Sequence, residues 1–271
     1  MKTISGLGKE SRTRLAEIMR QTKGTITVSQ AAEILRLPAA SAAQMLARWA
    51  NQGWLSRIRQ GLYVPVPLEA RTPEVALEDA WMIAEQLYSP CYIGGWSAAE
   101  YWGLTEQIFR TVVVITTRKP RDRKPIIKGT SFLIRTIPEK ALFGMKPIWR
   151  GQVKVNISDQ TRTVLDMLND PSLGGGIRPT VDVFKSYLKS EQKDTGLLIS
   201  YARSLGNGAV FKRLGFLAER FAKDEKNLIE ACRSRLTKGN AKLDPSLPAD
   251  RLATAWKLWV PSAWTKEKTG D

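Results

Sequence analysis

Two arginines lie close together in the stretch WLSRIRQGLYVPV, in which a glycine separates two apolar runs. The pattern predicts a strand, a tight turn at residues 59–61, and a second strand that Pro65 and Pro67 end at a sheet edge. The planar guanidinium groups of Arg57 and Arg59 suit such a turn, because they can bind phosphate oxygens or enter a narrow minor groove. The stretch therefore indicates phosphate binding rather than catalysis.

Residues for other chemistry are scarce. The chain has no histidine, which removes the commonest general base and metal ligand and every Ser/His or Cys/His arrangement. Carboxylate-only metal catalysis would need Glu100, Asp159, Asp166 and Asp170, but these are scattered. Asp159 is better interpreted as a residue at a helix N-terminus and Asp166 as a surface carboxylate. We therefore predict no catalytic residue, no metal site and no cofactor.

The composition indicates a folded, strongly basic protein. The 271 residues are 43% hydrophobic and 25% charged, and the net charge is +16 with an isoelectric point near 10.0. Such a charge attracts polyanions. Because the sequence shows no run of about 20 apolar residues and no signal peptide, we expect a cytoplasmic protein without a membrane partner. Cys91 and Cys232 are expected to be buried free thiols.

Three helical patterns precede the hairpin and must position it. Residues 10–24 form an amphipathic pattern, Thr27 and Gln30 form a capping box for a short second helix, and residues 38–53 form a third helix. The order helix, helix, helix, hairpin predicts a winged helix-turn-helix whose third helix fills a major groove. A module for protein contacts is the alternative. The residues expected to contact DNA are Ser41, Gln44, Arg48, Arg57, Arg59 and Gln60.

The chain after the hairpin predicts an α+β protein with a mostly helical C-terminal region. The polar stretch VPVPLEARTPE predicts a boundary that few contacts cross. Helices are expected at 73–90 and 94–104, the latter capped by Ser97 or its neighbour, and strands at 111–117, 131–137 and 151–158. The predicted units are a winged helix-turn-helix over 1–68 and a second domain over 69–271, divided into an α+β part (69–157) and a helical part (158–271).

Two further patterns leave alternatives open. The densest basic segment, TRKPRDRKPIIK, contains Arg118, Arg121 and Arg123. It is either a solvated loop between strands, since its prolines prevent regular pairing, or a second set of phosphate contacts that extends a DNA footprint. The tryptophans of AWKLWVPSAW, at positions 256, 259 and 264, are interpreted mainly as core residues, and alternatively as anchors for a protein partner.

The ordered set GWLSRIRQGLYVPV, YIGGWSAAEYWGL, TVVVITT and NISDQTRTVLDML resembles the AbiEi-type antitoxins of bacterial abortive-infection toxin-antitoxin systems, which are also described as transcriptional regulators. The likeness extends over roughly residues 10–190 and excludes the tryptophan-rich end. It implies a winged helix that binds inverted repeats in double-stranded promoter DNA and a C-terminal domain that neutralises a cognate nucleotidyltransferase toxin. The positions that match the family's recognition helix and wing are Ser41, Gln44, Arg48, Arg57 and Arg59.

Two other function classes stay open. The chain could be a single-component transcriptional regulator whose C-terminal domain senses a ligand or oligomerises. It could also be a carboxylate-dependent nuclease or nucleic-acid-modifying enzyme, which metal-dependent turnover would reveal.

Overall fold

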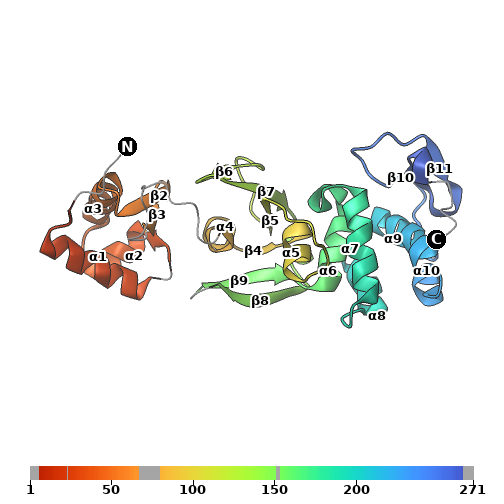
Figure 1. Cartoon of the computed structure of the whole chain (residues 1–271), viewed down its shortest axis with the longest axis horizontal. Coiled ribbons are helices and arrows are strands. Elements are labelled where there is room, and N and C mark those ends of the chain that lie inside the picture. Colours follow the sequence, from red (N-terminus) through yellow and green to blue (C-terminus); the bar gives the residue numbers. More distant parts are fainter. Residues whose placement is uncertain (1–5, 23, 67–79, 151–152, 265–271) are drawn as a thin grey trace.

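A computed structural model describes residues 6–22, 24–66, 80–150 and 153–264 of the chain (Figure 1). Three parts follow one another along the long axis: a small helical unit with a hairpin, a unit built on a six-stranded sheet, and a helical unit with a small sheet at its end. This element order confirms the predicted α+β class. The predicted boundary after residue 68 lies outside the described residues.

The first unit has the element order of a winged helix-turn-helix. Its elements are α1 (Lys9–Gln21), β1 (Ile26–Thr27), α2 (Val28–Leu35), α3 (Ala39–Asn51), β2 (Leu55–Arg59) and β3 (Leu62–Pro65). The capping box is confirmed, because the Thr27 side chain accepts from the Gln30 amide and the Gln30 side chain accepts from the Thr27 amide. The turn between β2 and β3 contains Gly61 with φ +78°, a conformation that glycine adopts without strain.

The core of this unit lies between its helices and one face of an antiparallel sheet with strand order β1-β3-β2. Ile18 of α1, Leu46 and Trp49 of α3, and Tyr63 of β3 are buried together. The apolar spacing that predicted each helix is therefore the pattern that packs this core.

The second unit contains a mixed six-stranded sheet with order β6-β7-β5-β4-β9-β8. Its elements are α4 (Ala80–Tyr88), β4 (Cys91–Ile93), α5 (Gly95–Tyr101), β5 (Thr111–Thr116), β6 (Ile126–Ile127), β7 (Thr130–Thr136), η1 (Glu139–Ala141), β8 (Met145–Arg150) and β9 (Val153–Ser158). Strands β5 and β7 pair in parallel, as do β4 and β9, and the other neighbours are antiparallel. The expected strands at 111–117, 131–137 and 151–158 correspond to β5, β7 and β9.

On one face of this sheet, Ala84 of α4 and Ala98 of α5 meet the buried side chains of Val114 and Val155, whereas Trp96 of α5 packs in the cluster on the other face. Helix α5 begins at Gly95, after an N-cap residue without a side-chain bond. The expected cap at Ser97 is wrong, because its hydroxyl instead accepts the Val113 amide of β5 at 3.0 Å.

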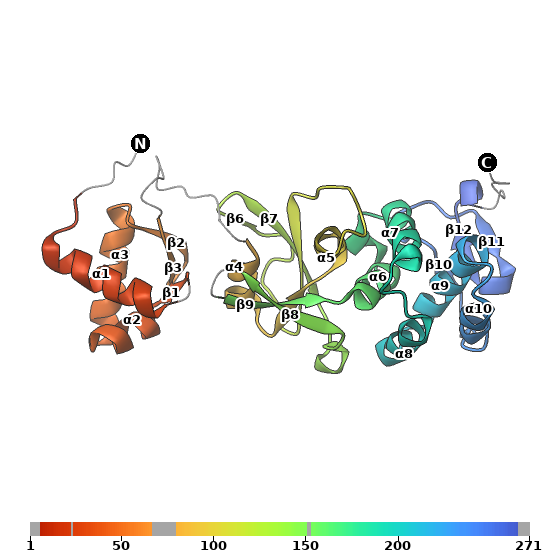
Figure 2. The same cartoon turned by 60° about the horizontal axis from the view of Figure 1, so that its bottom comes forward.

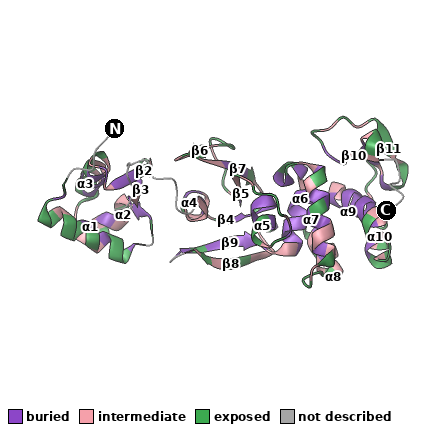
Figure 3. Cartoon of the chain, viewed as in Figure 1, coloured by how far each residue is buried: buried purple, intermediate pink, exposed green. Residues whose placement is uncertain are grey.

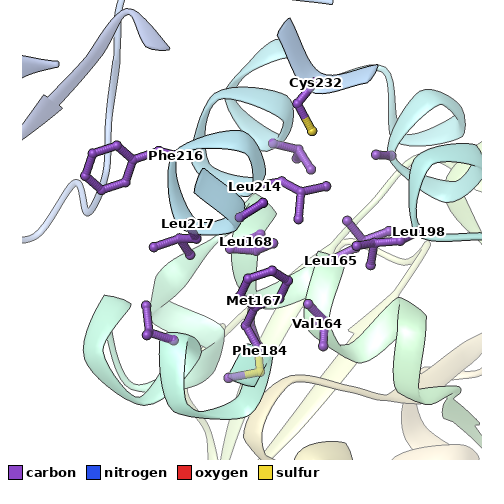
Figure 4. Packing of buried hydrophobic residues seen from close by; sticks show 14 of the residues in the cluster. Val164, Leu165, Met167, Leu168, Phe184, Leu198, Leu214, Phe216, Leu217 and Cys232 are labelled. Atoms are coloured by element: carbon purple, nitrogen blue, oxygen red, sulfur yellow. The ribbon is translucent and has the colours of Figure 1, made fainter. Parts of the chain in front are cut away.

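The C-terminal part is a helical bundle that ends in a second small sheet. Its elements are α6 (Gln160–Asn169), η2 (Pro171–Gly174), α7 (Ile177–Lys189), α8 (Thr195–Leu205), α9 (Gly208–Phe221), α10 (Lys226–Arg233), β10 (Ala241–Lys242), β11 (Arg251–Ala253), η3 (Thr254–Trp256), β12 (Leu258–Val260) and η4 (Ser262–Trp264). Figure 4 shows the core of the bundle, where Leu165, Phe184 and Leu214 meet from α6, α7 and α9. Figure 3 shows α6 and α9 mainly buried, whereas α10 exposes much of its surface. The sheet has the order β10-β12-β11 and was not expected, since the sequence predicted a nearly all-helical region. Its strands have only two or three residues, which is too short for a measurable hydrophobic periodicity.

The tryptophans at the C-terminal end differ in their burial. Trp256 is buried, and its indole Nε1 donates to Glu219 Oε2 at 2.6 Å. Trp264 is partly buried against the same bundle core, whereas Trp259 is 37% exposed. Core packing is therefore confirmed for Trp256. Cys91 and Cys232 are buried free thiols as expected, and burial raises the pKa of Cys232 to about 12.

Candidate nucleic-acid interface

Helix α3 exposes a polar face that is separate from its buried face. Ala42, Met45, Leu46 and Trp49 of this helix are buried in the winged-helix core. Ser41, Gln44 and Arg48, three or four residues apart, are all exposed. Because residues at this spacing share one side of a helix, the structure brings these three side chains to one surface.

The hairpin of β2 and β3 carries the second group of predicted residues. Arg57, Arg59 and Gln60 are all exposed. The pairing register shifts between Arg57, opposite Tyr63, and Arg59, opposite Leu62, so Ile58 lies at an irregularity of the strand. Because Tyr63 faces the winged-helix core and Leu62 faces the opposite side, the irregularity places Arg57 and Arg59 opposite residues of different faces of the sheet. The hairpin turn lies beside the first turn of α2, because the Val28 amide donates to the Gly61 carbonyl at 3.2 Å.

The basic segment between β5 and β6 is a loop whose backbone is fixed to β7. The carbonyl of Arg118 accepts from Thr136 Oγ1 at 3.1 Å, and the carbonyl of Arg123 accepts from the Ile134 amide at 2.8 Å. The side chains of Arg118, Arg121 and Arg123 are exposed. The loop therefore presents three guanidinium groups from an anchored backbone.

The wing and the basic loop meet at helix α4. Leu62 of β3 is buried against Ile83 and Leu87 of α4, and Ile58 of β2 and Ile127 of β6 pack on the same cluster. Figure 2 shows α4 at the end of the second unit that faces β2 and β3. This small apolar cluster joins the winged helix to the second unit. The expectation that few contacts cross between them stays a prediction. The cluster also places the arginines of the wing and of the loop on neighbouring segments.

Tyr88, at the end of α4, lies within electrostatic reach of both segments. Burial raises the pKa of its hydroxyl, Arg59 of the wing opposes that rise, and Asp122 of the loop adds to it. A sequence signal for the contact between the wing and α4 was present. Ile58 on β2, and Leu62 and Val64 at alternate positions of β3, give the wing a second apolar face.

The carboxylates considered for catalysis do not converge. Asp159 caps α6 as expected, since its side chain accepts the Arg162 amide at 2.7 Å. Asp166 is not a surface carboxylate: it is buried and accepts from Arg162 Nε at 2.8 Å and from the Tyr92 hydroxyl at 2.9 Å. Glu100 is exposed on α5, and Asp170 forms an ion pair with Arg135 at 3.4 Å. Within the described ranges, no three His, Cys, Asp or Glu side chains gather to form a candidate metal site.

Asp166 was missed as a buried residue because its neighbours Thr161, Arg162 and Thr163 gave α6 a polar sequence. All three are buried. Burial raises the pKa of Asp166, and the guanidinium of Arg162 opposes that rise.

Comparison with known proteins connects the winged helix to a family. No helix in the described part of the chain has the length and apolar character to cross a membrane. A search of curated proteins gives no match to the chain. Residues 14–66, which extend from α1 past the end of β3, match the family model described as "Transcriptional regulator, AbiEi antitoxin", and the resemblance seen in the sequence is confirmed over this span.

Proposed function

We propose that the chain is a DNA-binding antitoxin that represses its own operon through the winged helix and neutralises a cognate nucleotidyltransferase toxin through residues 69–271. One observation carries the DNA-binding part: helix α3 has an exposed polar face beside a wing that bears two arginines. Both lie in the segment that matches a family of transcriptional regulators. The protein acts in the cytoplasm, without catalytic activity of its own.

Helix α3 lies in the major groove of the operator in this proposal. The exposed Ala39 and Ala40 at its N-terminus let the backbone approach the bases, and Ser41, Gln44 and Arg48 contact base edges. An arginine bound to guanine, or a glutamine bound to adenine, contributes about 1–3 kcal/mol of discrimination against the wrong base. Inverted repeats in the promoter would present one such half-site to each of two copies of the chain.

The wing and the basic loop hold the phosphate backbone. Arg57 and Arg59 supply charge at the hairpin, and Gln60 supplies a neutral donor. The loop from 117 to 125 continues the contact, because Ile127, directly after it, packs on the same apolar cluster as the wing. Each phosphate neutralised contributes a slope of about −0.9 in log affinity against log salt concentration.

Binding of the full chain to a labelled duplex of its own promoter, and to a scrambled duplex, tests these roles. Replacing Arg57 and Arg59 by alanine should weaken both complexes, whereas Gln44→Ala or Arg48→Ala should also reduce the preference for the promoter. Alanine at Arg251, an exposed arginine on β11, is the matched control and should leave both affinities unchanged. Absence of any promoter preference in the wild type would refute operator binding, and equal effects of all four substitutions on both duplexes would refute the division of roles.

The loop needs a separate measurement. Alanine at Arg118, Arg121 and Arg123 together should make the salt slope shallower by up to about 2.7, if each guanidinium contacts one phosphate. An unchanged slope would leave the loop as a solvated connection between β5 and β6.

Toxin neutralisation is tested in cells that express the proposed cognate nucleotidyltransferase. The wild-type chain and the variant with alanine at Arg48, Arg57 and Arg59 should both restore growth, and only the wild type should repress a promoter reporter. Neutralisation that is lost together with repression would show that toxin control operates through DNA. Failure of the wild type to restore growth would favour a single-component regulator.

A further inference from the structure

A second basic surface lies at the edge of the six-stranded sheet that is opposite the basic loop. The strand order β6-β7-β5-β4-β9-β8 puts β6 at one edge and β8 at the other (Figure 1). Residues 145–158, which contain β8 and β9, include Lys146, Arg150 and Lys154 and no acidic residue. This edge therefore carries a local positive charge that the winged helix does not use.

Aromatic rings accompany these cations on the face covered by α4 and α5. The ring centroids of Trp81 and Tyr101 are 5.6 Å apart, and those of Tyr101 and Trp102 are 4.8 Å apart. The guanidinium of Arg150 lies 4.9 Å from the Trp81 centroid, and Lys146 Nζ lies 5.5 Å from that of Trp102. The central ring, Tyr101, is 43% exposed. The rings thus form a row with a cation at each end.

The other face of β8 carries an exposed indole. Trp149 is 67% exposed, an unusual exposure for so large an apolar side chain, and it stands opposite Lys154 in the pairing of β8 with β9. Because successive residues of a strand point to opposite faces, Trp149 and Arg150 flank the edge on its two sides. The edge strand thus has an aromatic ring and at least one cation within reach on each face, with Lys154 beside Trp149 and with Lys146 and Arg150 at the aromatic row.

We propose that this β8 surface, defined by Tyr101, Lys146, Trp149, Arg150 and Lys154, binds single-stranded nucleic acid. The three cations would bind phosphates, and the rings of Trp149 and Tyr101 would stack on bases, which is how many proteins bind single strands without reading sequence. A paired base offers no free face to such a ring, so the surface should prefer an unpaired strand over a duplex.

The positive charge of the β8 surface and the residues of β8 itself disfavour the alternative that a strand of another protein pairs with this sheet edge. Pro147 lies in the middle of β8 and has no backbone N–H to donate, and the lysine beside it is a residue that typically protects sheet edges from pairing. A polyanion with flat, stackable groups fits the observed residues better than a strand of another protein.

The single strand and the operator would bind at the same time. Five strand spacings of about 4.8 Å separate β6 from β8, so the two edges are roughly 24 Å apart. A duplex held by α3, the wing and the basic loop would leave the β8 surface free. Single-strand binding at β8 can therefore be distinguished from unspecific binding to the winged helix, because only the latter would be blocked by bound duplex.

Fluorescence anisotropy of a labelled (dT)20 strand with the full chain tests the proposal, in the absence and presence of saturating promoter duplex. We expect salt-sensitive binding that the duplex does not displace. Trp149→Ser and Tyr101→Ser should each weaken (dT)20 binding by about 5- to 100-fold, since one stacked base is lost. Both variants should bind promoter duplex like the wild type, which also shows that they are folded. Trp259→Ser, which removes a 37% exposed indole from β12, is the matched control and should leave (dT)20 affinity unchanged.

Three results would overturn the proposal. The first is no binding of (dT)20 by the wild type at low salt, the second is displacement of (dT)20 by the duplex, and the third is an equal effect of Trp149→Ser and Trp259→Ser. If the wild type does not bind (dT)20 but Trp149→Ser abolishes toxin neutralisation, the surface is a contact for a protein partner instead.

Discussion

A buried ion pair within helix α6 is hydrogen-bonded to Tyr92 of strand β4, and removal of its carboxylate should destabilise the protein strongly. Arg162 Nε donates to Asp166 Oδ1 at 2.8 Å, and Arg162 Nη2 donates to the Tyr92 hydroxyl at 2.9 Å. The Tyr92 hydroxyl in turn donates to Asp166 Oδ2 at 2.9 Å. The two charged side chains are 0% and 4% exposed. Each group of this triad therefore depends on the other two for its polar partners.

Asp166→Asn should lower the free energy of unfolding by about 3–5 kcal/mol. The substitution keeps the shape of the side chain but leaves the Arg162 guanidinium buried without a counter-charge, and loss of one partner of a buried pair has this magnitude. The loss is a large part of the roughly 5–15 kcal/mol that stabilises a typical domain. Joint replacement of Arg162 by Met, Asp166 by Leu and Tyr92 by Phe should recover most of it, because no buried polar group of the triad is then left unpaired.

Urea unfolding at pH 7, followed by circular dichroism, measures these differences. Glu225→Gln is the control, because Glu225 forms an ion pair with Lys193 at the same 2.8 Å separation but with side chains that are 29% and 40% exposed. That substitution should change the unfolding free energy by less than about 1 kcal/mol. The reasoning fails if Asp166→Asn is no more destabilising than Glu225→Gln, or if the triple variant is as unstable as the single one.

Three further substitutions test the packing of other elements. Gly215→Ala should lower the urea midpoint, because a Cβ there would overlap the Trp256 indole, whereas Gly239→Ala, with no atom nearby, should not. Asp244→Asn should cost stability at pH 7 and approach the wild type below about pH 4. Burial raises the pKa of Asp244, but hydrogen bonds from Ser246 and the Ile177 amide outweigh burial and lower that pKa. The stability that the carboxylate contributes is therefore present above its unfolded-state pKa of about 3.9 and is lost as the pH falls through its lower folded-state pKa. Leu87→Ala should increase hydrogen exchange of β3 amides relative to those of α9, since it opens the cluster around Leu62; equal changes in both would contradict that contact.

The winged helix could be predicted from the sequence because its signals are local. The capping box of Thr27 and Gln30, the turn at Gly61 and the apolar spacing of α3 each depend on residues a few positions apart. The exposed positions of Ser41, Gln44 and Arg48 follow from the same spacing. What these side chains bind depends on the shape and charge of the whole surface, which a local sequence pattern does not describe.

The missed elements depend on residues that are distant in sequence. Strand β4 has three residues and lies between β5 and β9 in the sheet, so its position is fixed by pairing partners and not by its own pattern. Asp166 appeared polar and exposed because its partner Tyr92 is 74 residues away. Strand β8 escaped prediction because its edge position leaves Lys146, Pro147 and Trp149 exposed, and the expected alternation is absent.

The second apolar face of the wing shows that residues outside the family match hold the winged helix. In an isolated winged helix, the outer face of the sheet would expose Ile58, Leu62 and Val64 to water, but in this chain α4 and β6 cover it. Helix α4 therefore contacts the winged helix through Ile83 and Leu87 on one side, and through Trp81 it contacts the aromatic row behind β8 on the other. The helix that covers the outer face of the wing is thus the helix that also supports the aromatic row. The family match ends at residue 66, but the contacts that hold the wing in place continue into the second unit.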